Sequence, residues 1–215
     1  MTESFLSDDC PPMGIYETLY AFKDSFGKFM GEENTHPWSQ GFPLTTPLEK
    51  FNGPSIPNSI EVTPEDRFYP KAWGHPKLRE AISNYYNSHY DSAIAPENVM
   101  VFAGGRPGIY SVLAFLKEHV QVTIGNIEWP AYLDILHQTK ANAKIVAYTK
   151  ENNFHPDNSE YFDRNGLNHK TSIMPIISNP QNPSGQSRSG DELKELIEMA
   201  EQPKCGILLD EAYEM

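Results

Sequence analysis

The sequence has few cysteines and no long apolar run. Its two cysteines, Cys10 and Cys205, cannot form a disulfide framework or a Cys-x-x-Cys metal pair, so no metal site is predicted and a reducing, cytoplasmic setting is expected. No apolar stretch approaches the length that spans a bilayer, and the first residues lack the basic and apolar regions of a secretory signal. We therefore expect neither a membrane protein nor a secreted, disulfide-rich one.

Basic residues are also scarce relative to acidic ones. The chain has 17 Lys and Arg against 29 Asp and Glu, which gives a formal net charge of −12. This balance disfavours nonspecific binding of nucleic acid and docking on an anionic membrane. It leaves room for a small anionic ligand, because a local site can override the global charge.

The 215 residues suit one domain, or one domain with part of another. Residues 1–65 contain a segment dense in Pro, Gly, Ser and Thr, which break helices and strands. We interpret them as an irregular N-terminal arm or small-domain segment, followed by a main domain over 66–215.

The main domain alternates helical patterns with apolar runs. Ser189 and Glu192 predict a capping box at the start of the last helix. Strands are expected at 98–105, 120–126, 143–149, 172–178 and 205–210, and helices at 74–90, 106–119, 131–141 and 189–200. Because the strands are continuously apolar, both faces of the sheet should be covered. The prediction is an α/β fold with a mostly parallel sheet and helices on both faces.

In such sheets, ligands bind beyond the carboxyl ends of the strands. After the first expected strand, Gly104, Gly105 and Arg106 open a helix, where free backbone N–H groups favour an anion. The alternative is a tight turn with an exposed arginine. After the second strand, Trp129 is either a stacking surface for a planar ring or a core residue.

Polar residues follow the later strands. Asn182 lies in "SNPQNPSG", where two Asn-Pro steps force a kinked path, and its amide can serve a ligand or simply belong to a proline-rich turn. Asp210 ends the last strand, with Tyr213 three residues on. A buried carboxylate needs a partner, either a protonated ring nitrogen or a structural cap or ion pair. Together with the glycine turn and Trp129, these residues indicate a pocket for pyridoxal phosphate.

From about residue 38 to 215, the sequence resembles the class I/II aminotransferases of pyridoxal-phosphate fold type I. The resemblance is carried by "SNPQNPSG" followed by "LLDEAY", by "YPKAWGHPKLREAI" and by "SQGFP". It implies that backbone amides of Gly105 and Arg106, preceded by Gly104, hold the cofactor phosphate. It also implies that Trp129 stacks on the pyridine ring.

The resemblance further implies that Asn182 and Tyr213 hydrogen-bond the ring hydroxyl and that Asp210 pairs with the ring nitrogen. Tyr69 would reach the phosphate of the partner subunit's cofactor in a homodimer, and Gly41 would lie near the substrate carboxylate. The Asn182–Pro183 peptide is predicted to be cis.

One family feature is absent from the chain. The family's Schiff-base lysine lies beyond the Asp…Tyr strand, whereas the last lysine here is Lys204, before that strand. We therefore expect the N-terminal portion of an aminotransferase that moves an amino group between an amino acid and a 2-oxo acid, and that is inactive on its own. Two alternatives stay open, a pyridoxal-phosphate lyase or synthase of the same fold and a degenerate binding or dimerisation protein.

Overall fold

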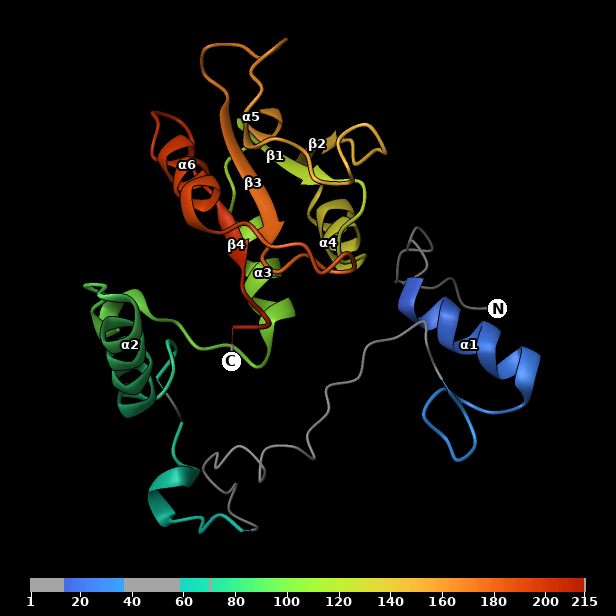
Figure 1. Cartoon of the computed structure of the whole chain (residues 1–215). Helices are drawn as coiled ribbons and strands as arrows, with labels where there is room; N and C mark the ends of the chain where they lie inside the picture. The colour runs from blue at the N-terminus through green and yellow to red at the C-terminus, as the bar shows by residue number, and fades with distance from the viewer. Residues whose placement is uncertain (1–13, 37–58, 70, 215) are drawn as a thin grey trace, which may run out of the picture. The chain divides into compact units, whose positions relative to one another are not determined.

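The computed structural model of the protein describes residues 14–36, 59–69 and 71–214. The chain divides into two units by its internal contacts, and Figure 1 labels their helices and strands. Of the described residues, one unit contains 103–214 with Gly14 and Ile15, and the other contains those from Tyr16 to Phe102. The predicted division into domains at residue 65 stays a prediction.

The first unit is built on a four-stranded sheet. Its strands are β1 (Val120–Gly125), β2 (Asn142–Val146), β3 (Ser172–Ser178) and β4 (Leu208–Asp210). They lie in the order β2-β1-β3-β4, and every neighbouring pair is parallel. The prediction of a mostly parallel sheet is confirmed, and β3 has the predicted bounds.

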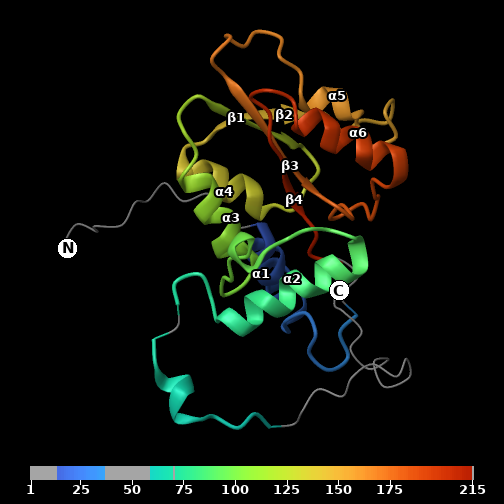
Figure 2. The ribbon, with the colours of Figure 1, turned by 90° about the vertical axis from the view of Figure 1, so that its left-hand side faces the viewer.

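Helices cover both faces of this sheet, as Figure 2 shows. The helices α3 (Gly105–Ala114) and α4 (Ala131–Thr139) pack on one face, and α5 (Asn158–Tyr161) and α6 (Gly190–Ala200) pack on the other. The first face buries Ile109, Leu113, Val122, Ile124, Tyr132, Ile135, Leu136 and Ile176. The second buries Val146, Tyr148, Tyr161, Ile177 and Leu196.

Side chains along β1 alternate between the two faces of the sheet. Val122 and Ile124 are fully buried against α3 and α4. Between them, Thr123 points to the other face, and its hydroxyl donates to the backbone carbonyl of Tyr161 in α5 at 2.8 Å. The strand is therefore shielded from water on both faces, as predicted, although Gln121 and Thr123 interrupt the apolar run that was expected there.

The predicted capping box at the start of α6 is wrong in its side chains. Ser189 occupies the N-cap position, but its hydroxyl makes no capping hydrogen bond. Glu192 instead accepts a hydrogen bond from His155 Nε2 at 2.5 Å and lies 3.5 Å from Arg188 Nε. The Glu192 carboxylate is therefore held by the His155 ring and the Arg188 guanidinium instead of by the backbone N–H at the start of α6.

The second unit is helical in the residues that the structure describes. It contains most of α1 (Gly14–Phe26) and all of α2 (Pro76–Tyr90). The interpretation of residues 1–65 as irregular missed α1. By contrast, α2 follows the prediction, and it starts with His75 as N-cap, whose Nδ1 accepts a hydrogen bond from the Lys77 N–H at 3.2 Å.

The predicted strand at 98–105 does not form. Its backbone groups bind elsewhere: Val101 N–H donates to the carbonyl of Trp73 at 3.0 Å, and the Arg79 side chain donates to the carbonyl of Val99 at 2.8 Å. These bonds attach the segment to the start of α2 within the second unit. The sheet therefore has four strands among the described residues, not the five expected.

Candidate functional site

The carboxyl ends of the four strands lie at one edge of the sheet, because all the strands are parallel. The segments that leave this edge carry Trp129 after β1, Asn182 after β3, and Asp210 at the end of β4. These are three of the residues predicted for the site. Because β1, β3 and β4 are neighbours in the sheet, the strand order brings these three residues to the same edge.

Gly104 and Gly105 form the entrance to α3. Gly104 is the N-cap residue with φ 101° and ψ 163°, and the helix begins at Gly105. A Cβ atom added to either glycine would meet no heavy atom within 4 Å, so the space above this backbone is open. The predicted helix entry is confirmed, although no strand precedes it. Free N–H groups and Arg106 in the first turn favour an anion here.

Replacing Gly104 by alanine should destabilise the protein by about 1–3 kcal/mol, because its backbone angles are accessible almost only to glycine. Gly105→Ala is the matched control, since Gly105 has no positive φ and no crowding and should unfold almost as the wild type does. Urea unfolding measures both. Equal stabilities for the two variants would contradict the assigned conformation.

Trp129 is half-buried between two side chains. The guanidinium carbon of Arg106 lies 5.1 Å from the centroid of its ring, and the ring of Tyr132 meets it edge-on at a centroid distance of 5.3 Å. Arg106 therefore joins the α3 entrance to the loop after β1. A planar ligand stacked on Trp129 would take the opposite face of the indole or displace Arg106.

Asp210 is half-buried at the end of β4, and its carboxylate is held from two sides. The hydroxyl of Tyr132 donates to Oδ2 at 2.5 Å, and the N–H of Ala212 donates to Oδ1 at 3.1 Å. Burial and the Asp210 hydrogen bond raise the pKa of Tyr132 far above its usual value. Tyr132 is therefore a permanent donor that orients the acid.

Asn182 follows β3 in a loop with two cis peptides, at Asn179–Pro180 and at Asn182–Pro183. The prediction of a cis bond at Asn182–Pro183 is confirmed. The Asn182 N–H donates to the hydroxyl oxygen of Ser178 at 3.1 Å, and Ser178 pairs in register with Asp210. The asparagine is therefore anchored next to the acid.

Not every predicted residue joins this cluster. Tyr213 is 58% exposed and, among the described residues, makes no hydrogen bond or ring contact that links it to the others. Tyr69 is fully exposed in the second unit. Gly41 lies outside the residues that the structure describes.

The structure adds buried polar residues that sequence reasoning missed. Tyr132 holds Asp210, and Glu128 accepts hydrogen bonds from Ser178 Oγ at 2.8 Å and from Tyr148 Oη at 3.0 Å. The only sequence signals were their positions: Glu128 directly precedes Trp129, and Ser178 directly precedes the Asn-Pro loop.

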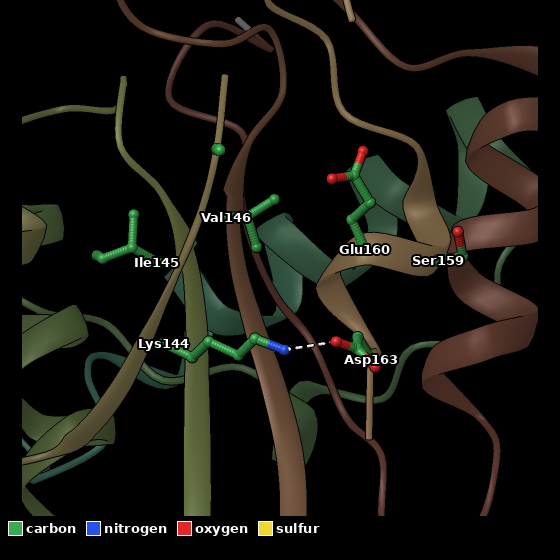
Figure 3. Close-up of a pocket in the computed structure, with 7 residues that line it drawn as sticks. Lys144, Ile145, Val146, Ser159, Glu160 and Asp163 are labelled. Carbon is green, nitrogen blue, oxygen red and sulfur yellow. Dashed lines mark hydrogen bonds and ion pairs between the residues drawn. The ribbon is translucent and has the colours of Figure 1, made fainter. Parts of the chain in front are cut away.

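A hollow elsewhere in the first unit lies along β2 and α5 (Figure 3). Lys144 and Asp163 form an ion pair of 2.8 Å in it, and the hydrogen bond from Lys144 lowers the pKa of Asp163. It is lined by Lys144, Ile145, Val146, Ala147, Ser159, Glu160 and Asp163. None of these is a predicted site residue, and β2 lies at the opposite edge of the sheet from β4.

Two kinds of feature are absent from the described ranges. Within them, no helix has the length and apolar character needed to cross a membrane. Nor do three His, Cys, Asp or Glu side chains gather there as a metal site would require.

The chain has a parallel α/β sheet whose carboxyl edge carries a glycine-opened helix, a half-buried indole and a hydrogen-bonded aspartate. In α/β domains of this kind, small molecules bind at that edge. Residues 34–215 match the sequence profile of the family described as aminotransferase class I and II. The chain belongs to this family. Members of the family depend on pyridoxal phosphate.

Relatives with established names are aminotransferases. The chain is 35% identical over 144 residues to an aspartate aminotransferase of Pyrococcus horikoshii, covering 66% of this chain and 36% of the relative. It is 28% identical over 159 residues to an LL-diaminopimelate aminotransferase of Protochlamydia amoebophila, covering 68% and 36%. The chain thus spans little more than a third of the length of these relatives.

Solved structures share the fold. Aspartate aminotransferase from Thermus thermophilus with maleate matches with a TM-score of 0.60 at 24% identity, over 68% of this chain and 38% of that one. An aminotransferase from Mycobacterium tuberculosis matches all of this chain and 53% of its own, with a TM-score of 0.67 at 18% identity. The predicted fold type I architecture is confirmed.

Proposed function

We propose that this chain supplies the cofactor floor of a pyridoxal-phosphate-dependent aminotransferase, which moves an amino group between an amino acid and a 2-oxo acid. The single observation that carries the proposal is the hydrogen bond from the Tyr132 hydroxyl to the Asp210 carboxylate at the end of β4. Asp210 pairs with Ser178 in the sheet, and the ring of Tyr132 also contacts Trp129. An oriented, half-buried carboxylate that shares the neighbour Tyr132 with an indole is suited to a protonated aromatic nitrogen.

The chemistry of these residues suits the phosphate and the aromatic ring of the cofactor. The open backbone at Gly104 and Gly105, the first N–H groups of α3 and the Arg106 cation suit a phosphate. Trp129 offers a ring face at the same edge of the sheet. When bound, pyridoxal phosphate supplies an electron sink for the substrate's α-carbon.

Each residue then has a task that its own chemistry permits. Asp210, oriented by the Tyr132 hydroxyl, would pair with the ring nitrogen and hold its proton. Trp129 would fix the plane of the ring, and Asn182 would donate its side-chain amide to a ring oxygen. Tyr213 would join Asn182 there once its exposed ring turns inward.

Other parts of the proposed enzyme lie beyond this cluster. The lysine that binds the cofactor covalently would come from a segment outside these 215 residues. Tyr69, which is fully exposed here, would contact the phosphate of the partner's cofactor in a cytoplasmic homodimer, and Gly41 would approach the substrate carboxylate.

Spectra and donor screening of the purified full-length protein test this function. Pyridoxal phosphate should give a saturable near-ultraviolet and visible absorbance, and the spectrum should change on addition of aspartate or LL-diaminopimelate, the donors in the relatives' names. A 2-oxo acid should restore the first spectrum. Formation of pyruvate, ammonia or a cyclised product without a 2-oxo acid would favour the lyase or synthase, and no cofactor spectrum would refute the proposal.

A further inference from the structure

Glu128 is a buried carboxyl group at the centre of the sheet's carboxyl edge. It is 8% exposed and stands directly before Trp129. The cofactor roles proposed above do not use it. A carboxyl group is rarely placed in such surroundings without partners, because burial disfavours its charge.

Its two oxygens join two different segments to the Trp129 loop. Oε2 accepts a hydrogen bond from Ser178 Oγ at 2.8 Å, and Oε1 accepts one from Tyr148 Oη at 3.0 Å. Ser178 lies at the end of β3, and Tyr148 follows β2. Glu128 therefore connects the segments that leave three adjacent strands.

The connection continues to the proposed cofactor contacts. Ser178 Oγ, while donating to Glu128, accepts the N–H of Asn182 at 3.1 Å, and Ser178 pairs with Asp210 in the sheet. A second hydrogen bond, from Gln181 Nε2 to the carbonyl of Ile127 at 2.6 Å, joins the same two loops as the bond between Ser178 and Glu128. The loops of Trp129 and Asn182 are thus fastened at two points.

We propose that Glu128 is a positioning residue, whose carboxylate fastens the Trp129 loop to the Ser178–Asn182 segment and so sets the affinity of the site for pyridoxal phosphate. The inference rests on the proposed function for its ligand, but the fastening itself is a property of this chain.

The surroundings of Glu128 define its protonation. The titratable and charged groups that face it are Tyr148 after β2, Tyr161 of α5, Arg188 before α6 and Tyr132 of α4. Burial raises the pKa of Glu128 to about 7, against the lowering effect of the Ser178 and Tyr148 hydrogen bonds and of the Arg188 charge.

The protonation of Glu128 should affect cofactor affinity through its hydrogen bonds with Ser178 and Tyr148. Above pH 7 the carboxylate accepts from Ser178 and Tyr148 as charge-assisted bonds, which are roughly twice as strong as neutral ones. Below pH 7 the protonated group has lost that charge, so the fastening is weaker. Cofactor affinity should therefore rise through pH 7 in the wild type.

The test compares Glu128→Gln with wild type in the full-length protein, at pH 6 and pH 8. Glu128→Gln should lower the affinity for pyridoxal phosphate roughly tenfold at pH 8, the effect expected for one charge-assisted hydrogen bond, and by much less at pH 6. Glu160→Gln, an exposed carboxyl in the hollow of Figure 3, is the matched control and should bind as the wild type does at both values.

A second readout needs no cofactor. In apoprotein that keeps Trp129 as its single tryptophan, acrylamide should quench the fluorescence more strongly after Glu128→Gln or Ser178→Ala, and the double variant should match the stronger single one. Unchanged quenching and pH-independent affinity ratios would overturn the positioning role while leaving the aminotransferase proposal intact. Increased quenching without any cofactor binding by the wild type would refute the proposed function and, with it, the link from fastening to cofactor affinity.

Discussion

Replacing Asp210 by asparagine in the full-length protein is expected to lower kcat by roughly 10²–10³-fold, the loss seen when one preorganised electrostatic group is removed from an active site. In the wild type, the Tyr132 hydroxyl donates a hydrogen bond to Asp210 Oδ2 at 2.5 Å. Asparagine keeps an oxygen that can accept this bond, but it removes the negative charge. Without that charge, residue 210 would stabilise a proton on the ring nitrogen of the cofactor much less, and the electron sink that the cofactor supplies would be weaker. The cofactor should stay partly bound through the α3 entrance and Trp129.

Asp210→Ala separates the chemical effect from the structural one. It removes the acceptor as well, so the fully buried Tyr132 hydroxyl would lose its partner at a cost of about 1–3 kcal/mol in the free energy of unfolding. Asp163→Asn is the control: it breaks a partly exposed ion pair with Lys144, and it should leave kcat unchanged. Steady-state kinetics and urea unfolding decide the matter, and an Asp210→Asn variant with wild-type kcat would remove the basis of the proposed mechanism.

Much of the first unit could be predicted from apolar runs. The segment 172–178 reads as a strand with the observed bounds of β3, because β-branched and apolar residues stand between a polar loop and an Asn-Pro turn. Helical spacing likewise indicates α2 and α4. These patterns are local, so they can be recognised in the sequence without knowledge of tertiary contacts.

The segment at 98–105 shows where such patterns fail. It has the composition of a strand, but Arg79 and Trp73 take its backbone groups before a ladder can form. A strand needs a neighbour to bond with, and sequence composition does not name that neighbour. The prediction of an irregular segment over residues 1–65 missed α1, because it was based on the Pro-, Gly-, Ser- and Thr-rich stretch that follows this helix.

Site residues divide in the same way. The position of Trp129, Asn182 and Asp210 at the carboxyl edge of the sheet could be predicted, because each stands at or just after the end of an apolar run; their role as cofactor contacts stays a prediction. Their partners could not be predicted, because Tyr132 lies 78 residues from Asp210 and Glu128 lies 50 residues from Ser178. Such pairs can be identified only when the order of the strands in the sheet is known. Nothing in the local sequence distinguishes the buried Glu128 from an exposed acid.

Residues 1–215 on their own should form no covalent adduct with pyridoxal phosphate at one defined lysine. No lysine follows Asp210 in the chain, and Lys204 lies at the other end of the strand. Lys204 lies in a turn before β4, and the next residue, Cys205, pairs with Ile173 near the start of β3, whereas Asp210 pairs with Ser178 at its end. Five strand residues between those two pairs correspond to about 17 Å at 3.3 Å per residue. The Lys204 ammonium is also engaged by the carbonyl of His169. Covalent attachment requires an amine at bonding distance from the aldehyde, and we expect no lysine of residues 1–215 to supply it.

Borohydride reduction followed by peptide mass mapping measures the outcome, with circular dichroism confirming that the purified chain is folded. Scattered, substoichiometric labelling of exposed lysines is expected, with no turnover of amino donors. The full-length protein serves as the positive control and should carry one adduct beyond Asp210. Lys204→Arg should leave the pattern of the short chain otherwise unchanged. A single stoichiometric adduct on one lysine of residues 1–215, together with turnover, would show that these residues contain the whole catalytic apparatus and that the proposed division of the site is wrong.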